Sequence, residues 1–475
     1  MTTFLTGLGI LLIGGFFYGL FMERFFGADE RKTPAVARND GSEYVPMPTW
    51  KCALVHLLNI AGTGPVLGPI QGILFGPVVF ITIPLGCVLA GAVHDYMIGM
   101  ISLRDDGAQM QDLVRSYLGK HVAWLFNVFI CVMALLVVVA FTYSPGDIFV
   151  ISFMKQQAAV TNPWTWAAYA VVFVYYLLAT YMPIDKLIGR VYPVIGSLFI
   201  VSAILIFIMI FTKHLPLQDL TLENWRGLRP NMIPLFFVTV ACGIASGFHS
   251  TQATLIARSL KREKCGRKVF FNMMLMEGFI AMIWAAVAMG VMGKYGLSNA
   301  GNANRTLVEI VNTLMGDKAG FIVMAGFIVL PITTGGTTMR ILRIMLCELL
   351  NIGSSRIGKT LVGAGMVAAS LALLFIVKFQ PDGFAIIWRY FAWSNQILVV
   401  FTLAVATSWC VKQNKSILFT VVPGAFYLYV VSSFILNAKV GFNLSWDASY
   451  LISGLLSLVF IAFFSFKKLT SKKSL

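Results

Sequence analysis

The sequence predicts an all-α polytopic membrane protein with about 13 transmembrane helices. Of its 475 residues, 58% are hydrophobic and only 12% are charged, and the mean hydropathy is +0.82. Glycine and proline interrupt two apolar stretches, at Asn59–Pro69 and Ala241–Ser250. Lipid cannot pair the backbone groups that such breaks expose, so a break survives only beside a cavity or a bound solute. Two broken helices therefore favour a transporter that binds its substrate between them.

Apolar runs of about 20 residues, the length that crosses a bilayer, place the helices in order. The first run, 2–22, has no preceding positive region and no small-residue cleavage pattern, so we expect a retained helix and not a signal peptide. The other runs are near 52–75, 77–101, 121–141, 164–182, 191–212, 232–257, 269–292, 319–339, 360–377, 383–409, 416–436 and 448–466.

The loop charges orient these helices. With the N-terminus outside and the C-terminus cytoplasmic, the inside loops hold 26 of the 36 Lys and Arg residues and the outside segments hold nine. An excess of basic residues inside is the usual rule of membrane topology. It also explains the net charge of +16, so we expect no nucleic-acid partner. The basic run Arg258–Lys268 either follows this rule or binds a partner or anionic membrane lipid.

The orientation suggests an internal repeat. The broken helix at 52–75 runs outward and the one at 232–257 runs inward, with five spans between equivalent positions. We therefore expect a single transporter domain over 1–475 with a five-plus-five inverted repeat, at 52–212 and 232–409. The helix at 2–22 would be an N-terminal addition, and 416–466 a C-terminal helix pair.

The first break offers candidate substrate-binding residues. Glycine lets the backbone approach a ligand, proline stops the helix, and the two polar side chains can contact a solute. A helix that restarts near Gly64 would point its N–H groups at an anion such as a carboxylate. The alternative is close packing of small residues against a neighbouring helix. The candidates are Asn59, Ala61, Gly62, Thr63 and Gly64.

The second break adds Ser246, Gly247, Phe248 and His249 to the predicted substrate site. His249 is the most informative of these, because histidine titrates near neutral pH. A neutral histidine that bonds across helices is the structural alternative. His56, His121 and His214 are less well placed, before the first break or at span ends.

Intramembrane carboxylates are costly and usually functional. His94 and Asp95 lie in the span 77–101, and Glu277 lies at the equivalent place in the second half. We expect these three residues to take up and release the coupling proton. The alternative is that both carboxylates pair with basic loop residues at the cytoplasmic face.

Two later segments carry polar residues within apolar runs. The stretch Pro331–Arg343 predicts a third broken helix, whose Arg340 and Arg343 either neutralise Asp95 or Glu277 or mark the inner boundary. Asn395 and Gln396 bind either a substrate or another helix.

These segments resemble the carbon starvation protein A (CstA) family of bacterial inner-membrane transporters. The matching stretches are TPAVARNDGSEYVP at 33–46, IAGTGPVLGP at 60–69, LAGAVHDYM at 89–97, ACGIASGFHS at 241–250, MLMEGFIAM at 274–282 and SNQIL at 394–398. The resemblance implies nutrient uptake linked to carbon starvation, with peptides as the substrates of some members and pyruvate, moved with protons, as that of others. It also implies kinship with the inverted-repeat amino-acid transporters of the LeuT-like fold.

The chain departs from the long family members in three respects. It is shorter, and the resemblance implies that it lacks a helix pair that they carry before ACGIASGFHS. Gly336 stands where similar proteins have an aspartate, and TQATLIAR follows FHS in place of SSGTTPK. The peptide specificity of the long members therefore does not carry over.

The sequence thus predicts a secondary active importer of small carboxylate-bearing nutrients that works by alternating access and is coupled to protons, with sodium as the alternative ion. No nucleotide-binding motif is present, and the seven cysteines show no metal spacing, so we expect no cofactor, no metal and no enzyme activity. A nutrient-binding membrane sensor and a channel are the alternative hypotheses for its function.

Overall fold

The computed structural model describes residues 1–41, 43–181, 185–226, 231–296, 302–352, 356–380 and 382–473. Within these ranges the chain is helical, and its only β-type pairings are two isolated bridges, Lys32 with Arg262 and Met47 with Leu260. The all-α prediction is confirmed. The expected loops at 183–190 and 213–231 fall partly outside the described residues.

The first half of the chain forms eleven α-helices, of which α1 and α2 join through a π-helical turn into one span, Thr2–Phe26. A second π-helical turn, Cys87–Gly91, joins α6 to α7. The helices are α1 Thr2–Gly9, α2 Gly15–Phe26, α3 Pro34–Arg38, α4 Thr49–Ile60, α5 Gly64–Gly72, α6 Val79–Gly86, α7 Ala92–Arg104, α8 Met110–Leu118, α9 Lys120–Ser152, α10 Pro163–Tyr181 and α11 Asp185–Thr212.

The second half begins with short helices and continues with long ones. They are α12 Leu222–Arg226, α13 Met232–Thr239, α14 Ala241–Ile244, α15 Phe248–Ala257, α16 Asn272–Tyr295, α17 Ala303–Leu349, α18 Arg356–Phe379, α19 Gly383–Lys412, α20 Leu418–Asn437 and α21 Trp446–Lys473. Long apolar runs explain the long helices, because a helix pairs its own backbone groups within lipid.

Nine single helices in the described ranges are long and apolar enough to cross a membrane, or ten spans if the bent pair α4 and α5 counts as one. Helices also occupy the expected ranges at 164–182, 191–212 and 232–257, the last of them broken into α13, α14 and α15. The count of thirteen spans and the inverted repeat stay predictions.

The predicted break at 331–343 is wrong. The helix α17 continues through Pro331–Arg343, and its one non-helical residue is Gly316, whose φ of 70° favours glycine. The glycine pair at 335–336 has a packing role instead. A Cβ on Gly335 would lie 2.1 Å from the Tyr176 hydroxyl, and one on Gly336 would lie 3.0 Å from the Tyr175 ring. The pair therefore lets α10 approach α17 closely.

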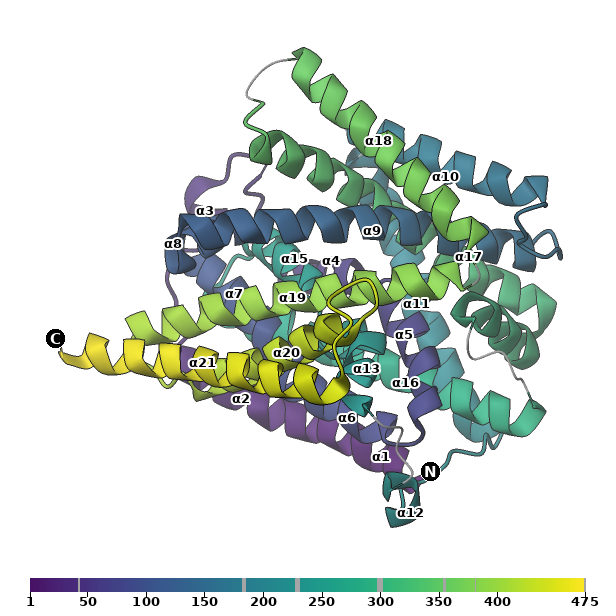
Figure 1. Cartoon of the computed structure of the whole chain (residues 1–475), viewed down its shortest axis with the longest axis horizontal. Helices are drawn as coiled ribbons and strands as arrows, with labels where there is room; N and C mark the ends of the chain where they lie inside the picture. Colours follow the sequence, from purple (N-terminus) through teal and green to yellow (C-terminus); the bar gives the residue numbers. More distant parts are fainter. Residues whose placement is uncertain are drawn as a thin grey trace.

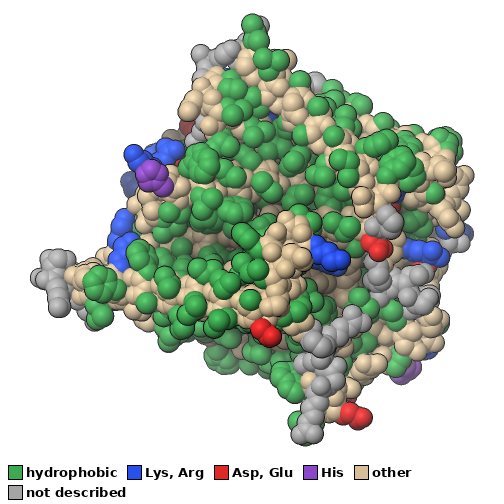
Figure 2. Space-filling model, in the orientation of Figure 1, with side chains coloured by type: hydrophobic (Ala, Val, Ile, Leu, Met, Phe, Trp, Pro, Cys, Tyr) green, Lys and Arg blue, Asp and Glu red, His purple; other side chains and the backbone are tan. Residues whose placement is uncertain are grey.

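The broken segments lie at the centre of the molecule. Figure 1 shows α4, α5, α13 and α15 in the interior, with the long helices α9 and α19 running across them and α1, α2 and α21 along one side. The helix α5 packs against α14 and α16, and α15 packs against α4 and α7. The surface around this interior is rich in apolar side chains, as Figure 2 shows, which fits contact with lipid.

The basic run Arg258–Lys268 forms ion pairs with the loop that follows α2. Arg258 pairs with Glu43 at 2.6 Å, Lys264 with Glu30 at 2.8 Å, and Arg267 with Glu23, at the end of α2, at 2.7 Å. These contacts are within the chain, so they give the run a structural role that the topology rule alone does not supply. Together with the two β-bridges, they tie the segment after α2 to the segment after α15.

Candidate functional site

The first break separates α4 from α5 by three residues, and the two helices bend by 50°. Ile60 ends α4, and α5 begins at Gly64, followed by Pro65. Proline is favoured in the first turn of a helix because its missing N–H has no partner there in any case. The prediction that a helix restarts near Gly64 is confirmed.

The second break is stabilised by Asn395 of α19. Between α14 and α15 the backbone is extended at Ala245. The Asn395 carbonyl accepts a hydrogen bond from the Gly247 N–H at 3.1 Å, and the Asn395 side-chain oxygen accepts one from the Phe248 N–H at 2.8 Å. The Asn395 amide also donates to the Ser246 hydroxyl at 2.7 Å. One residue thus satisfies the polar groups that the break exposes.

The two breaks pack directly against each other. A Cβ on Gly64 would lie 2.4 Å from the Cβ of Cys242, and one on Gly68 would lie 2.9 Å from the carbonyl oxygen of Thr239. A Cβ on Gly62, by contrast, would meet no atom within 4 Å. The glycines therefore divide into those that allow close packing and one that faces open space.

A small cavity of about 30 Å³ lies where the breaks meet. Its polar lining comes from both breaks, from Thr334 of α17 and from Asn395, and its apolar wall comes from α4, α9 and α19. Space of about 10–15 Å³ holds one water molecule, so the cavity accommodates water but no nutrient of several heavy atoms. The lining residues are Asn59, Ile60, Gly62, Gly64, Val137, Phe141, Cys242, Ser246, Phe248, His249, Thr334, Phe391 and Asn395.

Most of the predicted substrate residues therefore meet at one place: Asn59, Gly62, Gly64, Ser246, Phe248, His249 and Asn395 all line the cavity. Four others do not. Ala61 and Thr63 are buried beside it, and Gly247 packs against Leu398 and Asn395. Gln396 donates a hydrogen bond to the Phe237 carbonyl at 2.6 Å, so this residue bonds another helix.

The predicted proton-coupling residues form a buried cluster around Asp95. One oxygen of Asp95 lies 2.7 Å from Nδ1 of His94, and the other lies 3.2 Å from Nδ1 of His249. Nε2 of His56 is 3.8 Å from Asp95, and Nε2 of His249 is 3.4 Å from Glu277. All five side chains are at most 1% exposed. The cluster joins α4, α7, α15 and α16.

The geometry of His249 allows a proton to move. When the ionised Asp95 accepts a hydrogen bond from Nδ1–H of His249, the second ring nitrogen faces the Glu277 carboxyl group. One proton can then sit on Nε2 of His249 or on Glu277, whose oxygens have no hydrogen-bond partner in the described residues. An unpaired buried charge is costly, which favours keeping a proton in this pair.

In the described residues, the side chains that lie beside the two carboxylates are histidines: His94 of the same helix and His56 and His249 of other helices for Asp95, and His249 for Glu277. Arg340, one of the proposed neutralising residues, donates to the Ala179 carbonyl at 2.7 Å. Arg104, at the end of α7, has a carboxylate partner of its own: Glu263 accepts from it at 2.7 Å. The histidine contacts of Asp95 and Glu277 thus favour the coupling interpretation over loop pairing.

Sequence reasoning missed two parts of the site. His56 was judged less well placed, yet its ring lies beside Asp95 and packs edge-on against Phe270, with centroids 5.5 Å apart. The apolar wall of Val137, Phe141 and Phe391 also went unnoticed, because apolar residues within apolar helices carry no local signal. Counting His56 as one turn before the break would have suggested its position.

A second buried ion pair lies away from the cavity. Lys378 of α18, expected at an outside boundary, contacts Asp147 of α9 at 2.9 Å and donates to the Ala158 carbonyl at 2.9 Å. Tyr169 donates to the same carboxylate at 2.5 Å. The Lys378 ammonium also lies 4.3 Å from the ring centre of Tyr143. Both charges are therefore well compensated.

Among the described residues, no group of three or more His, Cys, Asp or Glu side chains has the arrangement needed to hold a metal ion. The chemistry that the cluster offers is hydrogen bonding and proton exchange between imidazole and carboxyl groups.

Comparison with known structures shows the fold alone. The structure of one variant of the manganese transporter of Eremococcus coleocola matches with a TM-score of 0.55 and 11% identity, covering 91% of this chain and 98% of that one. A second variant of the same transporter matches with a TM-score of 0.54 over the same share of this chain.

Relatives in sequence include membrane transporters. An uncharacterized membrane protein of Haemophilus influenzae is 36% identical over 332 residues, which cover 59% of this chain and 88% of that protein. The peptide transporter CstA of Escherichia coli is 28% identical and covers 58% of this chain and 48% of its own. The pyruvate/proton symporter BtsT of Escherichia coli is 28% identical and covers 55% and 44%. The matches thus span about half the length of these two transporters.

The family model described as carbon starvation protein CstA matches residues 1–162, 146–321 and 300–433. These matches include both breaks, the carboxylate cluster and Asn395. The chain therefore belongs to the carbon starvation protein CstA family.

Proposed function

We propose that this chain is a proton-coupled importer of a small carboxylate-bearing nutrient, in a bacterial inner membrane, with its N-terminus outside and its C-terminus cytoplasmic. The proposal rests on the family membership and on the transporter names of two relatives. Peptides and pyruvate, which those names mention, share a carboxylate group. That shared group defines the proposed substrate class.

One observation carries the coupling proposal: His249 belongs to both parts of the site. It lines the cavity between the breaks, and its ring contacts Asp95 and Glu277. A carboxylate bound in the cavity would lie next to the imidazole ring of His249. Substrate charge and the proton of the cluster would then stabilise each other, which links the two binding events.

The small cavity favours alternating access. At about 30 Å³ it cannot hold pyruvate or a peptide without movement of its walls. The walls include residues of α4, α5, α14 and α15, which are short helices on either side of the two breaks. We propose that they separate to admit substrate from one side and then from the other.

Uptake by proteoliposomes under an imposed pH gradient tests the proposed function. We expect the purified chain to concentrate pyruvate, a short peptide or an amino acid when the outside is acidic, and to lose this ability when a proton carrier collapses the gradient. If accumulation requires sodium, the coupling ion is sodium and not the proton, while the assignment as a transporter still holds. Flux that neither saturates nor concentrates the solute would indicate a channel, and binding without flux would indicate a sensor.

A further inference from the structure

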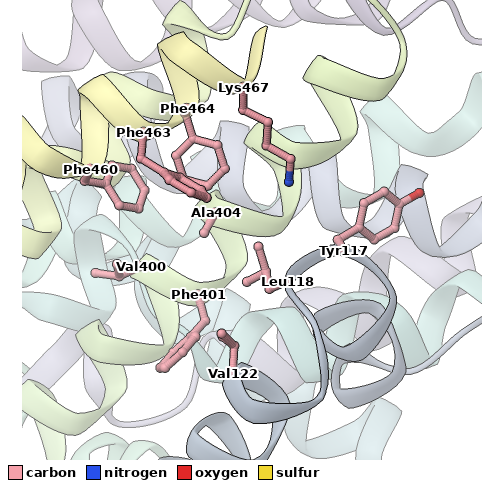
Figure 3. A pocket seen from close by; sticks show the side chains of 10 residues that line it. All are labelled: Tyr117, Leu118, Val122, Val400, Phe401, Ala404, Phe460, Phe463, Phe464 and Lys467. Atoms are coloured by element: carbon pink, nitrogen blue, oxygen red, sulfur yellow. The ribbon is translucent and has the colours of Figure 1, made fainter. Parts of the chain in front are cut away.

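An apolar groove of about 300 Å³ lies far from the breaks, between α9, α19 and α21. Figure 3 shows three aromatic rings of α21 facing residues of α19 across the groove. The apolar residues that define it best are Phe460, Phe463, Phe464, Val400, Phe401 and Ala404. All three helices are among the spans long and apolar enough to cross a membrane. The groove is therefore formed between helices that are each able to cross a membrane.

One end of the groove is polar and basic. Figure 3 places Lys467 and Tyr117 at this end, opposite Phe460. Lys412, the last residue of α19, has its ammonium 4.2 Å from the ring centre of Tyr117. Two lysines thus gather where α19 and α21 approach their C-terminal ends. Figure 2 shows Lys and Arg side chains along the edge at which, in the same orientation in Figure 1, α9 begins and α21 ends.

Asp105, in the turn after α7, interacts with two residues of this end, Tyr117 and Lys412. Tyr117 hydrogen-bonds to it, and Lys412 acts on its charge, but burial is the largest influence and raises the pKa of Asp105 above its usual value. No ion pair of Lys467 was found among the described residues. The end of the groove therefore carries a surplus of positive charge at the membrane boundary.

We propose that this groove binds a phospholipid with an anionic headgroup, with one acyl chain between α19 and α21 and its phosphate beside Lys467 and Lys412. The apolar lining suits a hydrocarbon chain, and the lysines suit a phosphate at the depth where a headgroup sits. A peptide partner fits less well, because the groove offers few polar groups for its backbone. The inference does not depend on the transported substrate.

Thermal unfolding of the delipidated full chain in detergent tests this proposal. The added probes are phosphatidylglycerol, phosphatidylcholine with the same acyl chains, and glycerol phosphate without chains. We expect phosphatidylglycerol to raise Tm in a saturable manner, because a ligand that binds the folded state stabilises it. Phosphatidylcholine should raise Tm less, and glycerol phosphate should leave it unchanged.

Variants separate the groove from general lipid solvation. Lys467→Gln should increase the half-saturating phosphatidylglycerol concentration about fivefold, the loss expected for one lysine near an anionic headgroup. Ala404→Phe should remove the saturable rise by filling the groove. Lys439→Gln, an exposed lysine on the loop between α20 and α21, is the matched control and should behave as the parent chain.

Equal stabilisation by phosphatidylglycerol and phosphatidylcholine would overturn the proposal, as would an unchanged half-saturating concentration in Lys467→Gln. If Ala404→Phe does not fold, Lys467→Gln and the headgroup comparison still decide the outcome. Stabilisation by glycerol phosphate alone would indicate a surface anion site and not a lipid groove.

Discussion

His249 and Glu277 carry the proposed coupling at the scale of single residues. Their facing atoms are 3.4 Å apart within a fully buried cluster, and Asp95 holds the other side of the imidazole ring. The sequence predicted Asp95 and Glu277 from the cost of intramembrane charge, but it could not show that one histidine lies between them. That arrangement depends on the packing of α7 against α15 and α16, which lie far from it in the chain.

Replacing Glu277 with Gln should abolish accumulation driven by a pH gradient while exchange of labelled for unlabelled substrate continues. The amide keeps the shape of the side chain but cannot take up a proton, so the site still binds and turns over. Uptake and exchange in proteoliposomes measure the two activities. Glu223→Gln, at an exposed position in α12, is the control and should accumulate substrate normally. Normal accumulation by Glu277→Gln would remove Glu277 from the coupling role.

Replacing Lys378 with Met should destabilise the protein by about 3–5 kcal/mol, because it leaves the Asp147 charge buried without its cation. Adding Asp147→Asn to this variant should recover most of the loss. Thermal unfolding in detergent compares the single and double variants. A double variant that is no more stable than Lys378→Met would show that the ion pair is not the source of the effect.

At the scale of elements, the glycines of the first break allow helices to break and to approach one another. Their number in an apolar run predicted a broken helix, and the structure confirms the break, but the sequence could not say which glycine packs and which lines the site. Both Gly62 and Gly64 line the cavity, but only Gly64 is also in close contact with α14, whereas Gly62 faces open space. Two glycines two positions apart thus differ in whether they pack against the second break.

Replacing Gly64 with Ala should cost about 1–3 kcal/mol of stability, since the new Cβ would lie 2.4 Å from Cys242 and overpack the contact between the breaks. Gly62→Ala is the matched control. It should keep the stability of the parent chain, whereas Gly62→Leu should reduce protection by substrate. Thermal unfolding with and without substrate measures both effects. Equal losses in Gly64→Ala and Gly62→Ala would contradict the division of roles.

Asp29 and Glu30, in the loop that follows α2, should not contribute to the pH dependence of transport between about pH 5 and 8. Hydrogen bonds from Arg31 lower the pKa of Asp29, and a hydrogen bond from Lys264 lowers that of Glu30. Groups with a lowered pKa stabilise the folded state above their unfolded pKa of about 4, and this contribution is lost only as the pH falls further. Both carboxylates therefore stay charged over that range.

The pH profile of uptake by an Asp29→Asn/Glu30→Gln variant checks this expectation. It should have the same shape as that of the parent chain, while His249→Gln should change the shape because it removes the imidazole ring that contacts both Asp95 and Glu277. A shifted profile in the loop variant would locate the pH response outside the buried cluster.

At the scale of the whole molecule, composition and apolar runs predicted the helical membrane fold, and the family model supports it along most of the chain. The prediction of a third break at Pro331–Arg343 failed, because the glycine pair there serves contact with Tyr175 and Tyr176 of α10. Local composition cannot distinguish a glycine that breaks a helix from one that lets another helix approach. Only the packing of the complete bundle makes that distinction.

Local composition also could not reveal the whole candidate site. Polar residues within apolar runs indicated most of the cavity, but its wall of Val137, Phe141 and Phe391 comes from helices whose sequences look like any other span. The proposed mechanism depends on the whole arrangement, since His249 links the cavity to carboxylates on α7 and α16. Coupling between substrate and proton is therefore the central claim.

Substrate-driven proton movement tests this claim most directly. Proteoliposomes with a pH indicator inside and no imposed gradient receive a saturating concentration of the transported substrate. The account predicts that the interior acidifies as substrate enters, and that His249→Gln and Glu277→Gln abolish the acidification. The account is contradicted if substrate enters vesicles that hold the parent chain without acidifying their interior, and if changing the external pH does not alter substrate entry.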